Sequence, residues 1–271
     1  PKRRKERSAY RGFEGLEQRL LLTVAADYAN VLDGPQARIV NGAETSDYEA
    51  VGIVNGGCSG TLISPTHVLT AAHCLFDKAT GARIDHSQVE FLAGWRNGRA
   101  SAYRSITQAV VHPDYEYTGG ISSKGVSNDL ALLQLDHPIR NGKIRPFSTE
   151  AKPERGAKVA VVSYGAGRSE APSLQELCSV LALQQGMLVT SCTVDSGSSG
   201  APIFMVQDGE VQIVSIVSAK AEVEGQAVSL GTSLGAPLAQ LQAEMVAQQD
   251  RISRRLQSGM RNDTGAKFLK P

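Results

Sequence analysis

Short apolar runs recur through the middle of the chain, and each is bounded by Gly, Pro, Asn or Ser. Runs of this length, separated by turn residues and without helical patterns between them, are typical of antiparallel sandwiches or barrels. They fall into two groups of six, which favours two small barrels. The predicted strands are residues 52–54, 58–64, 68–71, 89–93, 105–111 and 130–135, then 158–164, 178–183, 187–191, 202–206, 212–218 and 227–233.

The C-terminal part of the chain has a different periodicity. Residues 237–257 contain no glycine, and their only proline, Pro237, suits the first turn of a helix. We therefore predict a terminal helix over about residues 236–257, with one face packed on the body, and a loose tail over 258–271. The apolar positions that recur near helical spacing are Leu238, Leu241, Met245, Ile252 and Leu256.

The first 38 residues also differ from the middle of the chain. Residues 1–10 are a basic run, and the apolar stretch 20–26 is at the lower limit of about 7–15 residues for the core of a secretory signal. The segment resembles the basic starts with an L-E-x-R-x-L-L pattern that some bacterial exported proteins carry. We interpret residues 1–38 as a leader or propeptide-like segment; the alternative is a short amphipathic helix on the body.

Length and charge narrow the class of protein. The chain has 271 residues and a net charge of +1, which argues against a strongly basic nucleic-acid binder. No stretch of eighteen apolar residues occurs, so no membrane-spanning helix is predicted. Residues 1–38 carry eight Lys and Arg against five Asp and Glu, and residues 244–271 carry six against three, which leaves −5 for residues 39–243. This distribution indicates a globular body with two basic, solvated or tethering ends.

The four cysteines form two pairs in sequence order. Cys58 and Cys74 are sixteen residues apart, and Cys178 and Cys192 are fourteen apart. Two bridges in this order are the simplest pairing, although four cysteines allow three connectivities and four buried free thiols are the alternative. No Cys-x-x-Cys pair occurs, which argues against zinc or thiol-redox chemistry. Two bridges imply an oxidising compartment, so we expect a secreted or periplasmic protein.

The strongest chemical motif is TLISPTHVLTAAHC at residues 61–74, in which Cys74 directly follows His73. A catalytic histidine must be held rigidly, and a cystine at the next residue would fix its backbone. This segment resembles the histidine motif of the trypsin/chymotrypsin-like serine proteases, T-A-A-H-C with a partner cysteine upstream. The resemblance implies a bond between Cys58 and Cys74 and makes crossed pairing with Cys178 or Cys192 unexpected.

Two further motifs follow in the order that this family uses. Asp129 opens the apolar run N-D-L-A-L-L, where a buried carboxylate needs a partner such as an imidazole N–H. Residues 197–202 read G-S-S-G-A-P and match the family pattern G-x-S-G-x-P with Ser199 as the nucleophile. Ser196 is the competing serine, but the residue two before it is Val194, whereas Ser199 has Gly197 there. A β-branched residue resists the tight turn that points an amide at an oxyanion.

The resemblance covers about residues 39–243 and is closest to a bacterial branch of trypsin-like peptidases. It implies an all-β fold of two six-stranded antiparallel barrels with a C-terminal helix, over about residues 39–145, 146–235 and 236–257. It also implies a serine endopeptidase with catalytic His73, Asp129 and Ser199, and an oxyanion hole formed by the amides of Gly197 and Ser199. The expected substrate is a protein or peptide. No cofactor, metal or nucleic acid is expected, and we expect a monomeric exported bacterial protein.

Several positions depart from the family pattern. Residues 38–42 resemble a zymogen activation site, in which cleavage after Arg38 would free the amine of Ile39; the alternative is that Ile39 simply enters the first strand. The Asp that pairs with such an amine in relatives is replaced here by Ser198, and Asp195 is a possible substitute. Proteolytic activation is therefore an open hypothesis.

The substrate-binding positions expected from the resemblance are Thr193, Ser218, Ala219 and Lys220. Thr193 is not the acid that selects Arg or Lys, and Val217 stands where bacterial glutamyl endopeptidases carry a histidine, which argues against a preference for Glu. Lys220 replaces a glycine typical of open pockets. Together with Ser198 it leaves a second hypothesis: a catalytically impaired, peptide-binding pseudoprotease.

Overall fold

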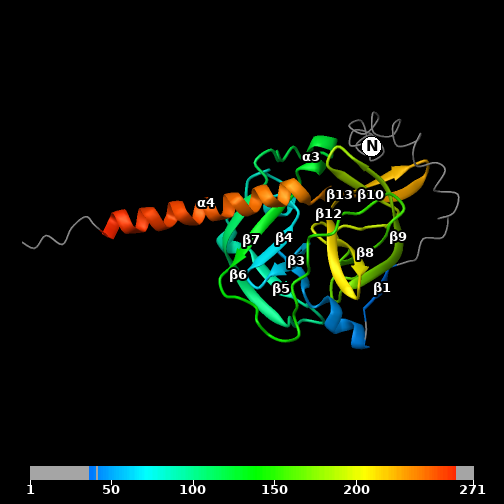
Figure 1. The fold of residues 1–271 in the computed structure, drawn as a ribbon, viewed down its shortest axis with the longest axis horizontal. Helices are drawn as coiled ribbons and strands as arrows, with labels where there is room; N and C mark the ends of the chain where they lie inside the picture. The colour runs from blue at the N-terminus through cyan, green and yellow to red at the C-terminus, as the bar shows by residue number, and fades with distance from the viewer. Residues whose placement is uncertain (1–36, 41, 261–271) are drawn as a thin grey trace, which may run out of the picture.

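The computed structural model describes residues 37–40 and 42–260. The predicted leader and tail therefore lie mostly outside the described residues. Two β-structures stand side by side, and a long C-terminal helix, α4, starts at the second of them, crosses the first and extends past it (Figure 1). Within the described residues, no helix combines the length and apolar character needed to cross a membrane.

The first barrel is closed, with strand order β2-β3-β4-β7-β6-β5. All its pairings are antiparallel. Its interior is filled by apolar side chains, among which Leu62, Leu69, Phe91 and Leu132 are almost completely buried. The strands are β2 (Val51–Val54), β3 (Cys58–Ser64), β4 (His67–Thr70), β5 (Glu90–Ala93), β6 (Ala102–Val111) and β7 (Ala131–Leu135).

The second sheet has the order β1-β9-β10-β13-β12-β11-β8, and a further pairing between β8 and β9 closes six of its strands into another antiparallel barrel. The short β1 pairs with the first two residues of β9. The prediction of two six-stranded barrels is thus confirmed. The strands are β1 (Arg38–Ile39), β8 (Lys158–Ser163), β9 (Ser173–Gln184), β10 (Met187–Thr190), β11 (Pro202–Gln207), β12 (Glu210–Val223) and β13 (Gln226–Ser233).

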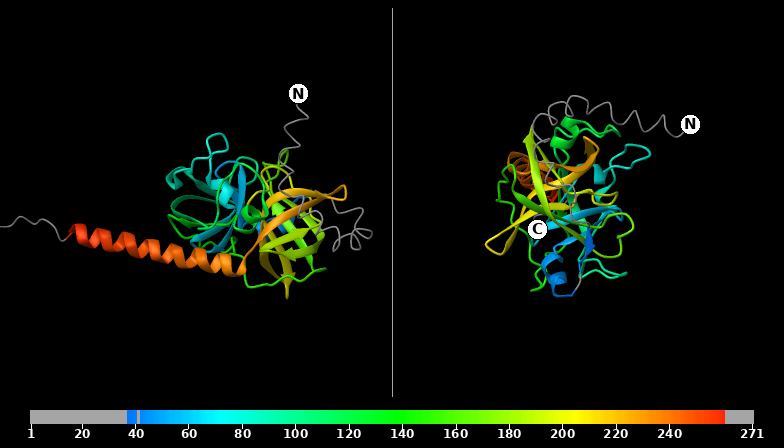
Figure 2. Two further views of the ribbon diagram at one scale, coloured as in Figure 1. Left: turned by 90° about the horizontal axis from the view of Figure 1, so that it is seen from above. Right: turned by 90° about the vertical axis from the view of Figure 1, so that its right-hand side faces the viewer.

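Among residues 37–40 and 42–260 the helices are few, and the predicted C-terminal helix is the longest of them. It is α4 (Gly235–Met260), which buries Leu238, Leu241 and Met245 and makes its main contacts with β6 and β7. Figure 2 shows that its C-terminal part projects beyond the barrels. The remaining helical segments are η1 (Gly42–Tyr48), η2 (Ala72–Leu75), η3 (His86–Gln88) and α3 (Ser123–Ser127).

Strand register decides which residues meet between the barrels. Thr70 at the end of β4 pairs with Ala131 at the start of β7, so residues just after β4 and just before β7 reach the same edge of barrel one. Pro202 at the start of β11 pairs with Ile216 in β12, which brings the loop before β11 beside the following residues of β12. Antiparallel pairing thereby gathers segments that are far apart in the sequence.

Candidate active site

His73 and Asp129 are joined by two hydrogen bonds. The backbone N–H of His73 donates to Oδ1 of Asp129 at 2.8 Å, and Nδ1 of its ring lies 2.7 Å from Oδ2. His73 lies in η2 directly after β4, and Asp129 precedes β7, so the register of these strands explains their meeting. Asp129 is 3% exposed, and a buried carboxylate requires such partners.

The second barrel also contributes to the surroundings of Asp129. The hydroxyl of Ser218, in β12, donates to Oδ2 of Asp129 at 2.5 Å. The hydroxyl of Thr232, in β13, lies 3.2 Å from the backbone oxygen of Asp129 and 2.6 Å from that of Val126. The backbone N–H of Asp129 donates to the Val126 oxygen. The carboxylate is thus fixed where the two barrels touch.

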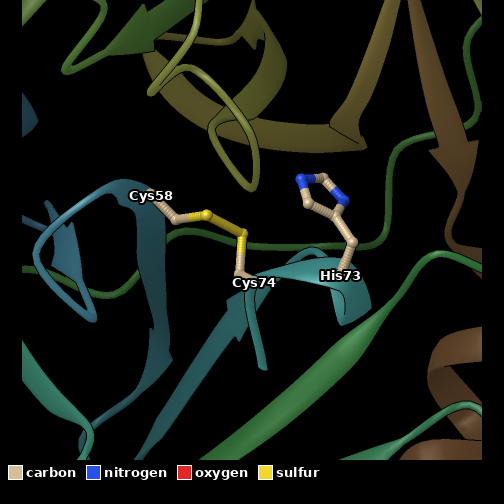
Figure 3. Close-up of side chains that lie close together, drawn as sticks. All are labelled: Cys58, His73 and Cys74. Atoms are coloured by element: carbon tan, nitrogen blue, oxygen red, sulfur yellow. A yellow bond between two sulfur atoms is a disulfide. The ribbon is translucent and has the colours of Figure 1, made fainter. Parts of the chain in front are cut away.

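The Cys58–Cys74 disulfide lies beside the imidazole (Figure 3). A ring nitrogen of His73 and both sulfur atoms lie within 4.8 Å of one another. Because the two sulfurs are bonded to each other, this cluster offers a metal ion only the imidazole. The second disulfide joins Cys178 to Cys192, so both bonds follow the pairing that the family resemblance implied.

Ser199 is tied to the first barrel through its backbone. Its carbonyl accepts a hydrogen bond of 2.8 Å from the N–H of Ser59, the residue next to Cys58. Gly200, the next residue, donates its N–H to Val217 at 2.8 Å. In the described part of the chain, no hydrogen bond links the Ser199 hydroxyl to the imidazole. Such contacts are often long in free enzymes and shorten when substrate binds.

Gly197 has a backbone that other residues tolerate poorly. Its φ is +92°, and a Cβ atom placed on it would overlap the carbonyl oxygen of Tyr164. Its own carbonyl accepts a hydrogen bond of 2.9 Å from the Ser59 hydroxyl. Within the described residues, the N–H groups of Gly197 and Ser199 donate to no protein atom.

The predicted substrate-binding residues separate into two groups. Ser218 and Ala219 line a cleft of about 390 Å³, and His73 and Asp129 are also among its lining residues. Thr193 and Lys220 are not among its lining residues. The N–H of Thr193 donates to the side chain of Gln175 at 2.9 Å, and Lys220 is exposed in β12 opposite Ser229.

Several other lining residues of this cleft were not anticipated from the sequence. They are Tyr115, Tyr117 and Ile121, from the loop between β6 and α3, and Lys78. Tyr117 stacks on Phe76 with ring centroids 5.2 Å apart. Burial, and then the negative charge of Asp129, raise the pKa of Tyr115 well above its usual range, so this residue remains a neutral phenol.

Ser59 is a second residue that the motifs did not indicate. Its N–H holds Ser199, its hydroxyl holds Gly197, and the same hydroxyl accepts from the N–H of Tyr164 at 3.1 Å. Its carbonyl accepts from the Thr70 hydroxyl at 2.8 Å. Thr70 lies on the neighbouring strand β4, whereas Ser199, Gly197 and Tyr164 belong to the second barrel and meet Ser59 only when the two barrels are assembled.

Two six-stranded barrels that meet at a partly buried histidine–aspartate pair define the trypsin-like class of fold. A family model described as "Trypsin" matches residues 39–232, which is more than half of the chain. The chain therefore belongs to the trypsin family of serine peptidases.

Two proteins with sequences similar to this chain are a peptidase and an activating factor, by the names they carry. An "Uncharacterized peptidase" of Corynebacterium glutamicum (strain R) is 25% identical over 239 residues, which cover 83% of this chain and 75% of that protein. "Phenoloxidase-activating factor 3" of Holotrichia diomphalia is 33% identical over 131 residues, which cover 43% of this chain. That match spans only 36% of the length of the Holotrichia protein.

A solved structure of a Glu endopeptidase has the same fold. It superposes with a TM-score of 0.64 over 79% of this chain and 98% of that chain, at 19% sequence identity. At this identity the likeness is one of fold alone.

Proposed function

We propose that this protein is a serine endopeptidase that cleaves peptide bonds through an acyl-enzyme. The observation that carries the proposal is the partly buried hydrogen bond between Nδ1 of His73 and Asp129. With Nδ1 bound to the carboxylate, Nε2 is the ring nitrogen left to take a proton from a nucleophile. Ser199 is the proposed nucleophile, because its backbone is tied to Ser59, next to the disulfide that flanks the ring.

In the proposed reaction, Oγ of Ser199 bonds to the carbonyl carbon of the substrate while its proton passes to Nε2 of His73. The carbonyl oxygen becomes an oxyanion, which the amides of Gly197 and Ser199 bind. His73 then gives its proton to the leaving amine as the C–N bond breaks. A water molecule attacks the resulting ester by the reverse sequence and restores the Ser199 hydroxyl.

Groups around the nucleophile and the base are proposed to assist the reaction in different ways. Asp129 fixes the tautomer of His73 and stabilises the imidazolium form through a hydrogen bond of 2.7 Å. An oxyanion-hole donor contributes roughly 3–4 kcal/mol to lowering the barrier in comparable enzymes. Ser218 and Ala219 line the cleft beside the reacting groups and are proposed to contact the substrate.

We propose that the enzyme prefers neither Arg or Lys nor Glu as the substrate residue at the cleaved bond. Thr193 carries no negative charge and is held by Gln175, so it provides no partner for a substrate Arg or Lys. Val217 is buried and apolar, so it provides no cation for a substrate Glu. The two disulfides support an oxidising location, and we propose that the protein is a secreted or periplasmic bacterial enzyme.

Labelling with a fluorophosphonate, which reacts with activated serines, tests the proposal. We expect the wild-type chain and the control Ser196→Ala to be labelled and to hydrolyse a casein substrate, and Ser199→Ala to do neither. Label that is retained in Ser199→Ala and lost in Ser196→Ala would identify Ser196 as the nucleophile. A folded wild-type chain that neither labels nor hydrolyses, but binds peptides, would instead be a pseudoprotease.

A further inference from the structure

The residue before the proposed nucleophile carries no charge. Ser198 is 1% exposed, and its hydroxyl lies 3.0 Å from that of Ser163. The N–H of Ser198 donates to the carbonyl of Asp195 at 3.0 Å. No carboxylate therefore stands at this position to bind a newly formed N-terminal amine, and the loop that carries Gly197 and Ser199 must be held in another way.

An ion pair between Arg168 and Asp195, at the start of this loop, restrains its conformation. One terminal nitrogen of Arg168 lies 3.0 Å from Oδ2 of Asp195, and Nε of the same guanidinium donates to the Ser173 hydroxyl at 3.1 Å. Ser173 in turn donates to the carbonyl of Ser163 at 3.1 Å. Because Ser163 also contacts Ser198, a closed circuit of hydrogen bonds joins the guanidinium to both ends of the segment 195–198.

A second contact holds the same segment from the neighbouring loop. The N–H of Ala166 donates to the carbonyl of Ser196 at 2.6 Å, and Arg168 lies two residues further along. The N–H of Arg168 donates to the carbonyl of Gly165 at 2.9 Å, which closes a tight turn. The planar guanidinium therefore projects from a turn that is itself bonded to the loop it holds.

Residues 38–40 are held by both strand pairing and hydrogen bonds. Arg38 and Ile39 form β1 against β9, and Val40 is completely buried. The N–H of Val40 donates to Pro172 at 2.9 Å, and its carbonyl accepts from Arg96 at 2.6 Å. These contacts hold residues 38–40 against the body of the protein through the backbone and a neighbouring arginine.

We propose that Arg168 is a positioning residue. Through Asp195 it fixes the conformation of residues 195–199, the oxyanion loop, so that the chain is active without cleavage after Arg38. This inference rests on the proposed peptidase function. The side chains of Arg168 and Asp195 are 27% and 50% exposed, and ion pairs of this exposure contribute little to stability. Their effect is on the placement of the Gly197 and Ser199 amides, where a misplacement of about 1 Å costs roughly 100-fold in rate.

The test compares Arg168→Gln, Arg168→Lys and the isosteric Asp195→Asn with the wild type in kcat, KM and Tm. We expect Arg168→Gln and Asp195→Asn to lower kcat by about 10- to 100-fold with KM almost unchanged, because the lost placement acts in the transition state. Arg168→Lys keeps the charge but not both contacts, so it should recover part of the loss. High salt should lower kcat in the wild type and not in Arg168→Gln.

Arg251→Gln is the matched control, because Arg251 forms a similar exposed pair with Glu244 at 2.6 Å on α4, a helix that contributes no residue to the cleft. This variant should keep the wild-type kcat and Tm. Equal kcat values for Arg168→Gln, Asp195→Asn and Arg251→Gln, in an active wild type, would overturn the inference and leave the peptidase function standing. A wild type that neither labels nor hydrolyses would overturn the function, and the inference with it.

Arg38→Gln tests the second half of the inference. It should hydrolyse casein at the wild-type rate while mass spectrometry shows the bond between residues 38 and 39 intact. Loss of activity in this variant, together with activity in wild type only after cleavage at Arg38, would overturn the inference and establish activation by a new N-terminus.

Discussion

The hydroxyl of Ser218 donates a hydrogen bond of 2.5 Å to Oδ2 of Asp129, across the junction of the two barrels. The same oxygen lies 2.7 Å from Nδ1 of His73, so one carboxylate oxygen connects a strand of the second barrel to the imidazole of the first. The orientation of His73, the proposed base, therefore depends on how the barrels dock. Ser218 is the side chain of the second barrel that transmits this dependence through Asp129.

Replacing Ser218 by Ala is expected to lower kcat. A hydrogen bond to a charged group contributes about 1.5–3 kcal/mol, which corresponds to roughly a 10- to 100-fold loss if all of it acts on the imidazolium form of His73. Steady-state kinetics on a peptide substrate measure the effect. Ser215→Ala is the control, because it removes a buried hydroxyl from the same strand that donates to the Thr232 carbonyl instead. An equal loss of kcat in both variants would contradict a specific role for Ser218.

Gly197→Ala is expected to disrupt the oxyanion loop. A Cβ here would overlap the Tyr164 carbonyl, and the φ of +92° is unfavourable for alanine. Since the loop must shift to relieve the overlap, we expect kcat to fall by about 100- to 1,000-fold, as when an oxyanion donor is lost.

Gly209→Ala is the control variant, because it introduces the same unfavourable positive φ for alanine without a steric overlap. Gly209 has a φ of +80° and nothing within 4 Å of an added Cβ. It should cost about 1–2 kcal/mol of stability, the penalty of a left-handed residue, and leave kcat unchanged. Wild-type kcat in Gly197→Ala would show that the amide of residue 197 is not placed as described.

The two disulfides are expected to differ in their effect on activity. Their cysteines are 16 and 14 residues apart, so replacing either pair by alanine should cost a similar free energy of unfolding, about 3 kcal/mol in the chain-entropy model. Loss of Cys58–Cys74 should also lower kcat, because Cys74 adjoins His73 and Cys58 adjoins Ser59. Loss of Cys178–Cys192 should mainly lower Tm. Denaturant unfolding and kinetics on both double variants decide this, and equal kcat values would contradict it.

Local pattern was sufficient to locate the barrels and the motifs. Alternation of short apolar runs with turn residues predicted both groups of six strands, because each barrel strand must bury one face and end at a turn. The family resemblance of residues 61–74 and 197–202 then identified His73 and Ser199 as candidates. The catalytic roles of these residues, and of Asp129, stay predictions, whereas the His73–Asp129 contact is a feature of the structure.

Contacts between distant polar residues could not be read in the same way. Ser59 holds Gly197 across 138 positions, and Arg168 reaches Asp195 across 27. A serine after a cysteine, or an arginine in a glycine-rich loop, carries no local signal of such a partner. The Ser59–Gly197 contact depends on how the two barrels pack, and the Arg168–Asp195 pair depends on how two loops of the second barrel fold together. The five-residue helix α3, which precedes Asp129, was missed for a related reason: it is too short to show helical periodicity.

His67 should make stability depend on pH. Its ring lies 2.8 Å from the Ser64 hydroxyl, and burial lowers its pKa below the usual value of 6.5. The unfolded chain therefore binds more protons than the folded chain just below pH 6.5, and the free energy of unfolding falls as pH decreases through that value towards the lowered pKa. His67→Gln should remove this part of the pH dependence in denaturant unfolding curves between about pH 5 and 7. A variant with the same slope as wild type would contradict the assignment.

The last prediction concerns how α4 is attached to barrel one. Leu241 is completely buried, whereas Val246, further along the helix, is 58% exposed. The Gln108 side chain also donates to the backbone oxygen of Met245 at 3.2 Å, which fixes the helix over β6. Leu241→Ala should therefore cost about 2–5 kcal/mol of stability, and the control Val246→Ala about 0.5 kcal/mol or less. If both variants unfold at the wild-type urea midpoint, the first half of α4 does not pack on the barrel as described.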